Sequence, residues 1–146
     1  MTRKPASSST TSCYVDANVF LNPVLYDVHQ VPEARAAAEF LKKVEAGQVK
    51  AMTSLLTWDE FTWIVRKNTD VATSRKKGQE FLAFPGLQFI PVSASIINKA
   101  QVLLEQYAIR PRDAIHVASG LGNGVREFIT FDDDLKGIPG ITCRRP

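Results

Sequence analysis

The stretch Arg110-Pro111-Arg112-Asp113-Ala114-Ile115-His116-Val117-Ala118 is the part of this sequence from which the fold can be worked out. Proline is favoured at the first position of a helix, where its missing N–H would have no partner, so a helix is predicted to begin at Pro111. The apolar residues that follow, as far as Leu121, are spaced so that most of this helix is buried. Asp113 is therefore expected in the first turn of a helix that enters the core. A carboxylate there either complements the helix dipole or forms one wall of a functional site.

Short apolar segments alternate with segments of helical periodicity along the rest of the chain. The strand-like segments are residues 13–16, 49–53, 87–92, 127–131 and 138–142. A short helix begins at residue 18, and Pro23 is compatible with it only near its start or at a break. Further helical segments are residues 32–46, 55–67, 70–83 and 93–106, and the helix from residue 111.

Strands separated by helices predict an α/β fold with a central parallel sheet of four to five strands and helices on both faces. Residues 13–146 are expected to form this domain without a second one, because the chain contains no long linker and no internal repeat. Residues 1–12 are basic and then rich in serine and threonine, and we expect them to form a disordered leader.

The composition narrows the class of protein. A formal net charge of +3 is compatible with a polyanionic partner but does not require one. Cys13 and Cys143 lack the spacing of a metal site or a disulfide framework, so free thiols in a reducing cytoplasm are expected. No apolar run is long enough to span a bilayer, and the leader lacks the apolar core of a signal peptide. The sequence therefore predicts a cytoplasmic protein without a membrane segment.

Four carboxylates occupy positions that are unusual for surface acids. Asp16 follows the first predicted strand and Asp132 follows the fourth, while Glu60 and Asp113 lie on helices among apolar neighbours. Ligands of parallel α/β sheets bind beyond the carboxyl ends of the strands. Carboxylates that gather there repel one another unless a cation neutralises them, and hard divalent cations such as Mg²⁺ or Mn²⁺ prefer oxygen ligands. The pattern therefore indicates metal-dependent chemistry on phosphodiesters.

Each of these acids also has a purely structural explanation. Asp16 is suited to cap the helix that follows it. Glu60 fits a capping box with Thr57, although that arrangement would leave two leucines outside the helix. Asp113 is able to pair with a neighbouring arginine, and Asp132 to belong to a solvated turn. The four explanations together are less economical than one shared site.

The remaining chemistry-bearing residues are expected to play lesser roles. His116 lies three residues after Asp113 on nearly the same helix face, which favours a hydrogen-bonded core histidine in support of the site. Trp58 and Trp63 have the helical spacing of core residues rather than of a surface that stacks nucleobases. The basic clusters at residues 66–67, 75–77, 110–112 and 144–145 are candidate phosphate contacts, but a solvated surface is their default.

The acids lie within motifs that resemble those of the PIN-domain nucleases, and especially of their VapC-type toxin branch. Val15-Asp16-Ala17-Asn18 is similar to the opening motif of that family, and Glu60 stands where the family has its glutamate. The stretch from Arg110 to Ala118 is close to the third motif and is the most specific part of the match. Ile129-Thr130-Phe131-Asp132-Asp133-Asp134 resembles the closing motif, although Leu135 replaces the phenylalanine that usually follows.

The resemblance implies a ribonuclease that depends on Mg²⁺ or Mn²⁺. It implies that Asp16 and Asp113 are direct metal ligands and that Glu60 and Asp132 complete the acidic set. It also implies supporting roles for Asn18, Thr130 and Asp134, and from their positions in the sequence Arg110 and His116 are expected to support the site as well. Of the arginines, Arg110 is expected to hold the acidic pocket together, and the role of Arg112 is left open.

The resemblance further implies an RNA substrate, a homodimer and a small antitoxin protein that blocks the site, commonly with an arginine. Two alternatives remain within the same fold, namely a housekeeping RNA-processing nuclease and a catalytically silent RNA-binding or interaction module. A phosphotransfer domain is disfavoured, because it would need a second aspartate at the first strand and a lysine at a late strand end, and Asn18 stands in the place of that aspartate.

Overall fold

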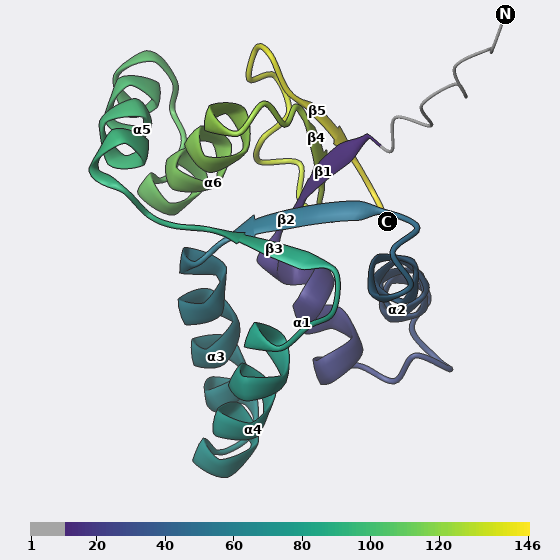
Figure 1. Cartoon of the computed structure of the whole chain (residues 1–146). Helices are drawn as coiled ribbons and strands as arrows, with labels where there is room; N and C mark the ends of the chain where they lie inside the picture. The colour runs from purple at the N-terminus through teal and green to yellow at the C-terminus, as the bar shows by residue number, and fades with distance from the viewer. Residues whose placement is uncertain (1–10) are drawn as a thin grey trace, which may run out of the picture.

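The computed structural model describes residues 11–146 (Figure 1). The strands are β1 (Ser12–Val15), β2 (Lys50–Ser54), β3 (Leu87–Ile90), β4 (Glu127–Ile129) and β5 (Thr142–Arg144). The helices are α1 (Ala17–Leu25), α2 (Pro32–Glu45), α3 (Leu56–Asn68), α4 (Val71–Leu82), α5 (Ala94–Gln106) and α6 (Pro111–Gly122). Among these residues no helix combines the length and the apolarity that crossing a membrane would require.

The strands form one parallel sheet in the order β3-β2-β1-β4-β5, which confirms the predicted α/β fold. β1 is the central strand, and its Tyr14 lies in register with Met52 of β2 and with Phe128 of β4. Because all five strands run in the same direction, the segments that follow β1 and β4 leave the sheet at the same edge. That edge is where Asp16 and Asp132 were expected to meet.

Side chains of β1 alternate between two apolar cores, one on each face of the sheet. Val15 packs into a core with α1, α2, α3 and α4, whereas Tyr14 packs with Val117 of α6 and with Phe128 of β4 on the other face. Figure 1 shows these two groups of helices on opposite sides of the sheet. The prediction of helices on both faces is confirmed. Because successive side chains of a strand point to opposite faces of the sheet, the position of a residue in β1 determines the core into which it packs.

Three predicted boundaries need correction. Ser12 opens β1, so it belongs to the sheet and not to the leader; residues 1–10 of the predicted leader lie outside the described residues. The last strand begins at Thr142 instead of residue 138, because Ile138 packs into the core before the chain reaches the sheet. α1 continues through Pro23, which lies so close to the end of the helix that only two residues follow it.

The two cysteines are free, as predicted, with Cys13 buried and Cys143 half-buried.

Candidate functional site

A cavity of about 560 Å³ lies beyond the carboxyl end of β1, and all four singled-out acids line it. Asp16 comes from the junction of β1 and α1, Glu60 from α3, Asp113 from the first turn of α6, and Asp132 from the segment after β4. Four separate parts of the chain therefore contribute one carboxylate each to the same hollow. The structure brings these predicted residues together, whereas their roles as metal ligands remain a proposal.

Asp16 is held by both of its carboxylate oxygens. Its Oδ1 accepts the backbone N–H of Ala17 at 2.7 Å, which caps α1. Its Oδ2 accepts the hydroxyl of Thr130 at 2.8 Å and the side-chain amide of Asn18 at 3.4 Å. The helix cap and the position at the cavity are therefore compatible functions of one side chain.

Asn18 and Thr130 fasten the segment after β4 to the start of α1. The side-chain amide of Asn18 donates to Thr130 Oγ1 at 3.1 Å, and Asn18 Oδ1 accepts the N–H of Phe131 at 3.2 Å. Thr130 Oγ1 also accepts the N–H of Asp132 at 3.1 Å. Because these bonds run between the two segments, they hold Asp132 and Asp16 on the same side of the cavity.

Glu60 takes no part in the capping box that its spacing allowed. α3 begins one residue later than expected, at Leu56, and Ser54 Oγ accepts the N–H of Leu56 at 3.1 Å. The hydroxyl of Thr57 is instead engaged with Thr53 Oγ1 at 2.7 Å inside the core. Glu60 is thus left facing the cavity in a half-buried position.

The Glu60 carboxylate meets His116, whose side chain is only 3% exposed. Glu60 Oε1 lies 2.7 Å from His116 Nε2, and His116 Nδ1 contacts the hydroxyl of Tyr14. One ligand atom each from Asp16, Glu60 and His116 lie within 4.8 Å of one another. Sequence analysis missed Tyr14, because a tyrosine in a buried strand has the same pattern as any core aromatic.

Arg110 bridges two acids at the rim. Its Nε donates to Asp113 Oδ2 at 3.0 Å and its Nη2 donates to Asp134 Oδ2 at 2.9 Å. Arg112 also lines the cavity, and its ion pair, at 3.8 Å, is with the exposed Asp59 of α3. Exposed ion pairs of this kind add little stability.

Burial and charge displace the pKa values of two groups in the cavity. Burial raises the pKa of Asp16, and this effect outweighs the opposing effects of the His116 charge and the Thr130 hydrogen bond. Burial alone would lower the pKa of His116, but the hydrogen bond and charge of Glu60, together with Asp16 and Asp113, raise it. The cavity therefore favours added positive charge, which is the electrostatic condition for binding a cation.

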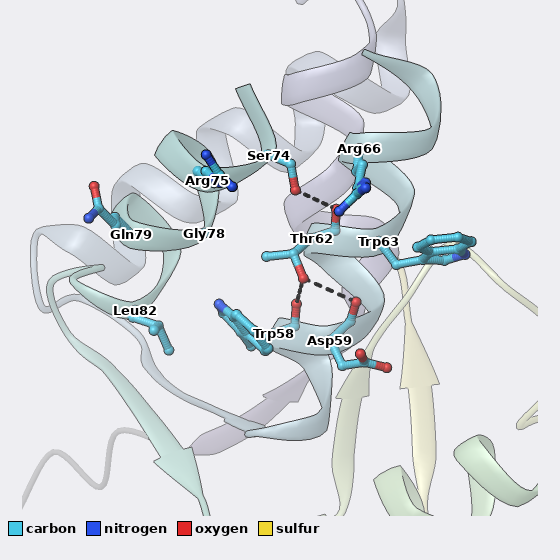
Figure 2. A pocket seen from close by; sticks show the side chains of 10 residues that line it. All are labelled: Trp58, Asp59, Thr62, Trp63, Arg66, Ser74, Arg75, Gly78, Gln79 and Leu82. Carbon is cyan, nitrogen blue, oxygen red and sulfur yellow. Dashed lines mark hydrogen bonds between the residues drawn. The ribbon is translucent and has the colours of Figure 1, made fainter. Parts of the chain in front are cut away.

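The expectation that Trp58 and Trp63 belong to the core is wrong, because they are 41% and 56% exposed. The buried stripe of α3 is narrower than predicted and consists of Thr57, Phe61 and Val65. Figure 2 shows Trp58 in a hollow between α3 and α4, whereas Trp63 points away from α4. Trp63 also lines the acidic cavity.

A parallel α/β domain whose carboxylates converge beyond the central strand is the class that the fold and the site define. The PIN domain family matches residues 13–141, so the chain belongs to the PIN domain family. No curated protein sequence matches it.

Solved structures of similar fold include toxins and toxin–antitoxin complexes. A toxin–antitoxin complex from Klebsiella pneumoniae has 23% identity and a TM-score of 0.63, with 89% of this chain and 95% of that chain covered. VapC20 of Mycobacterium tuberculosis, a sarcin-ricin loop cleaving toxin, has 17% identity and a TM-score of 0.69, with 92% and 99% covered. VapBC2 from Rickettsia felis, bound to a promoter DNA fragment, has 17% identity and a TM-score of 0.69, with 92% and 98% covered. At these identities the likeness shows a shared fold.

Proposed function

We propose that this protein is a metal-dependent endoribonuclease of the VapC type, the toxin of a toxin–antitoxin pair. The observation that carries the proposal is the convergence of four carboxylates from four elements in one cavity. Membership of the PIN domain family and the similarity to solved toxins support the same function.

The residues of the cavity fit a hard divalent cation. Their donors are carboxylate oxygens, which Mg²⁺ and Mn²⁺ prefer, and burial raises the pKa of Asp16, so a bound cation would stabilise its charged form. Asp16 and Asp113 would hold the ion directly, and Glu60 and Asp132 would complete the set. When bound, the cation supplies a Lewis acid that activates water and neutralises charge on the phosphate.

The protein's own contribution is to position these acids before substrate arrives. Asn18 and Thr130 fix Asp16 and the segment that carries Asp132, while Arg110 restrains Asp113 and Asp134. Groups held in this way lose little conformational freedom when an RNA phosphate enters the site.

The proposal includes three partners. The first is the substrate, RNA in the cytoplasm. The second is a small antitoxin, which would block the acidic cavity with a cationic side chain, and the third is a second copy of this chain in a homodimer. Support for the antitoxin comes from the similarity to solved toxin–antitoxin complexes.

RNA cleavage with Mg²⁺ tests the proposal. We expect Asp16→Asn and Asp113→Asn to lower the cleavage rate by about 100-fold or more, because even residues outside the ligand shell contribute about 10–100-fold. Asp133→Asn is the matched control, since Asp133 is exposed and pairs with Lys136 outside the cavity. Equal cleavage by all four proteins would disprove the assignment of the site.

Expression of the chain alone separates a toxin from a housekeeping nuclease. A toxin arrests growth, the Asp16→Asn variant does not, and the product of a neighbouring small reading frame relieves the arrest. Normal growth with the active wild-type chain would support the RNA-processing alternative.

A further inference from the structure

A chain of hydrogen bonds runs through the core from the end of β2 to the acidic cavity. The backbone N–H of Ser54 donates to the hydroxyl of Tyr14 at 3.0 Å. The same hydroxyl contacts His116 Nδ1, and His116 Nε2 lies 2.7 Å from Glu60 Oε1. Tyr14 is fully buried and His116 is 2% exposed, so water does not compete for the contact between them.

With His116 neutral and Glu60 ionised, one placement of the protons gives every contact of this chain one donor and one acceptor. A backbone N–H can only donate, so the Tyr14 oxygen uses a lone pair toward Ser54 and its own O–H is free to donate to His116 Nδ1. A neutral imidazole that accepts at Nδ1 carries its proton at Nε2. That proton then points at the Glu60 carboxylate.

We propose that Tyr14 and His116 are positioning residues that hold the Glu60 carboxylate for metal binding, with the Tyr14 hydroxyl selecting the Nε2–H tautomer of His116. This inference rests on the proposed function, since it assigns Glu60 to the metal site. Tyr14 and His116 touch neither the substrate nor the ion in this proposal.

Glu60 needs such a partner because nothing else restrains it. Within residues 11–146 its carboxylate makes a hydrogen bond only to His116, through Oε1, so Oε2 remains available to a ligand. Without that bond the carboxylate would move among several rotamers on α3 and would bind an ion less tightly.

The Tyr14–His116 pair is itself held rigidly. The Tyr14 ring packs against Phe128 with ring centroids 4.9 Å apart and meets the His116 ring edge-on at 5.6 Å. Tyr14 belongs to β1, His116 to α6, and Glu60 to α3, whose first residue follows Ser54 closely. The relay therefore locks the orientation of Glu60 to the sheet and not only to its own helix.

Binding of Mn²⁺ to the full chain, followed by the electron paramagnetic resonance of the free ion, tests the relay without any cleavage assay. We expect Tyr14→Phe and His116→Asn each to weaken Mn²⁺ binding by about 10-fold or more, as for other residues that orient metal ligands. His116→Gln should restore most of the affinity, because its amide nitrogen lies near the position of Nε2 and can donate to Glu60.

Two exposed positions provide matched controls. Tyr26→Phe and His29→Asn make the same chemical changes on residues outside the cavity and should leave Mn²⁺ affinity unchanged. Unaltered affinity in Tyr14→Phe and His116→Asn, with weakened binding in Glu60→Gln, would overturn the relay and leave the proposed function intact. Absence of Mn²⁺ binding by the wild-type protein would overturn the proposed function itself.

The tautomer is observable without metal. In ¹⁵N–¹H correlation spectra recorded where the imidazoles are neutral, we expect His116 to carry its proton at Nε2, and the exposed His29, the other histidine of the chain, serves as the comparison. In Tyr14→Phe the spectrum of His116 should shift toward a mixture of tautomers. A proton at Nδ1 in the wild-type protein would contradict the proposal, and this wild-type measurement does not depend on whether any variant folds.

Discussion

Thr130 shows how much one hydroxyl can organise at the scale of a residue. It donates to Asp16 and accepts from Asn18 and from the backbone of Asp132, all within 3.1 Å, and it is only 2% exposed. Together with Asn18 it links the first and the last segments of the site. Valine at this position would keep the shape of the side chain without the hydroxyl, whereas serine would keep the hydroxyl. The two variants therefore separate the effect of the hydrogen bonds from the effect of packing.

We expect Thr130→Val to lower the free energy of unfolding by about 1–3 kcal/mol, because the donors of Asn18 and Asp132 lose a buried acceptor. Metal affinity should also fall, since Asp16 loses one of its restraints. Thr130→Ser keeps the hydroxyl and should lie closer to the wild type in both quantities. Urea unfolding and Mn²⁺ titration measure the two effects, and identical values for the valine and serine variants would contradict this role.

Cys13 gives the protein a pH dependence on the alkaline side. Burial, with a smaller contribution from the charge of Glu127, raises the pKa of the Cys13 thiol from 9.0 to about 11. The unfolded chain therefore releases this proton at a lower pH than the folded chain. Stability is unaffected by this group below pH 9 and decreases as the pH rises toward 11, by about 2 kcal/mol in total.

Urea unfolding between pH 8 and pH 11 checks this expectation when the wild type is compared with Cys13→Ala. The variant should lose less stability over this range. Burial also raises the pKa of Tyr14, but Tyr14 is present in both proteins, so the difference between the curves isolates Cys13. Parallel curves would show that the thiol does not contribute.

Single residues also show where sequence analysis reaches its limit. Asp16 and Asp113 were identifiable only in combination with Glu60 and Asp132, because capping or the helix dipole explains each of them alone. Trp58 and Trp63 were assigned wrongly, because periodicity tells which residues share a helix face but not how much of that face neighbours cover. Tyr14 could not be found, since its function depends on a contact with His116, 102 positions away.

At the scale of elements, α6 packs so closely against the sheet that position 120 has no room for a side chain larger than that of glycine. A Cβ atom on Gly120 would lie 2.4 Å from Cζ of Phe128, whose ring is 1% exposed. Gly122, near the end of the same helix, faces only the tips of Ile96 and Lys99, at 3.1 and 3.2 Å. The two glycines therefore form a matched pair.

We expect Gly120→Ala to destabilise the protein by about 1–3 kcal/mol through overpacking, despite a gain of about 1 kcal/mol in helix propensity. Gly122→Ala should stay within about 1 kcal/mol of the wild type, because the flexible side chains that it meets can move. Thermal or urea unfolding distinguishes the two variants. Equal stability of both would mean that the Phe128 ring yields to the added methyl group.

The elements themselves were largely predictable, and the errors have local causes. Pro111 at the start of α6 and Gly47 after α2 act through backbone geometry that is independent of the fold. β5 was placed too early because Ile138 and Thr142 both suit a strand, and only packing of Ile138 into the core decides between them.

At the scale of the whole molecule, metal binding and folding should be coupled. A ligand that binds only the folded state stabilises it, by about 2.7 kcal/mol at a concentration of 100 times its dissociation constant. We therefore expect saturating Mg²⁺ or Mn²⁺ to raise the melting temperature, and a chelator to reverse the shift. Asp16→Asn should lose the shift, and Asp133→Asn should keep it.

Calorimetric scans with and without metal measure this effect. A shift of equal size in Asp16→Asn would place the ion elsewhere on the molecule.

The sequence predicted that a site exists at this edge of the sheet, but not the strand order that creates it. That order follows from the pairing of β1 with both β2 and β4, which no local pattern encodes.

The central position of β1 has a consequence for synthesis. β1 leaves the ribosome first, yet one of its two neighbours, β4, consists of residues 127–129. Asp16 therefore emerges long before Thr130 and Asp132, and the cavity cannot be assembled on a nascent chain that stops short of them. A nascent chain that stops before Asp132 thus lacks the complete set of carboxylates on which the proposed nuclease activity depends.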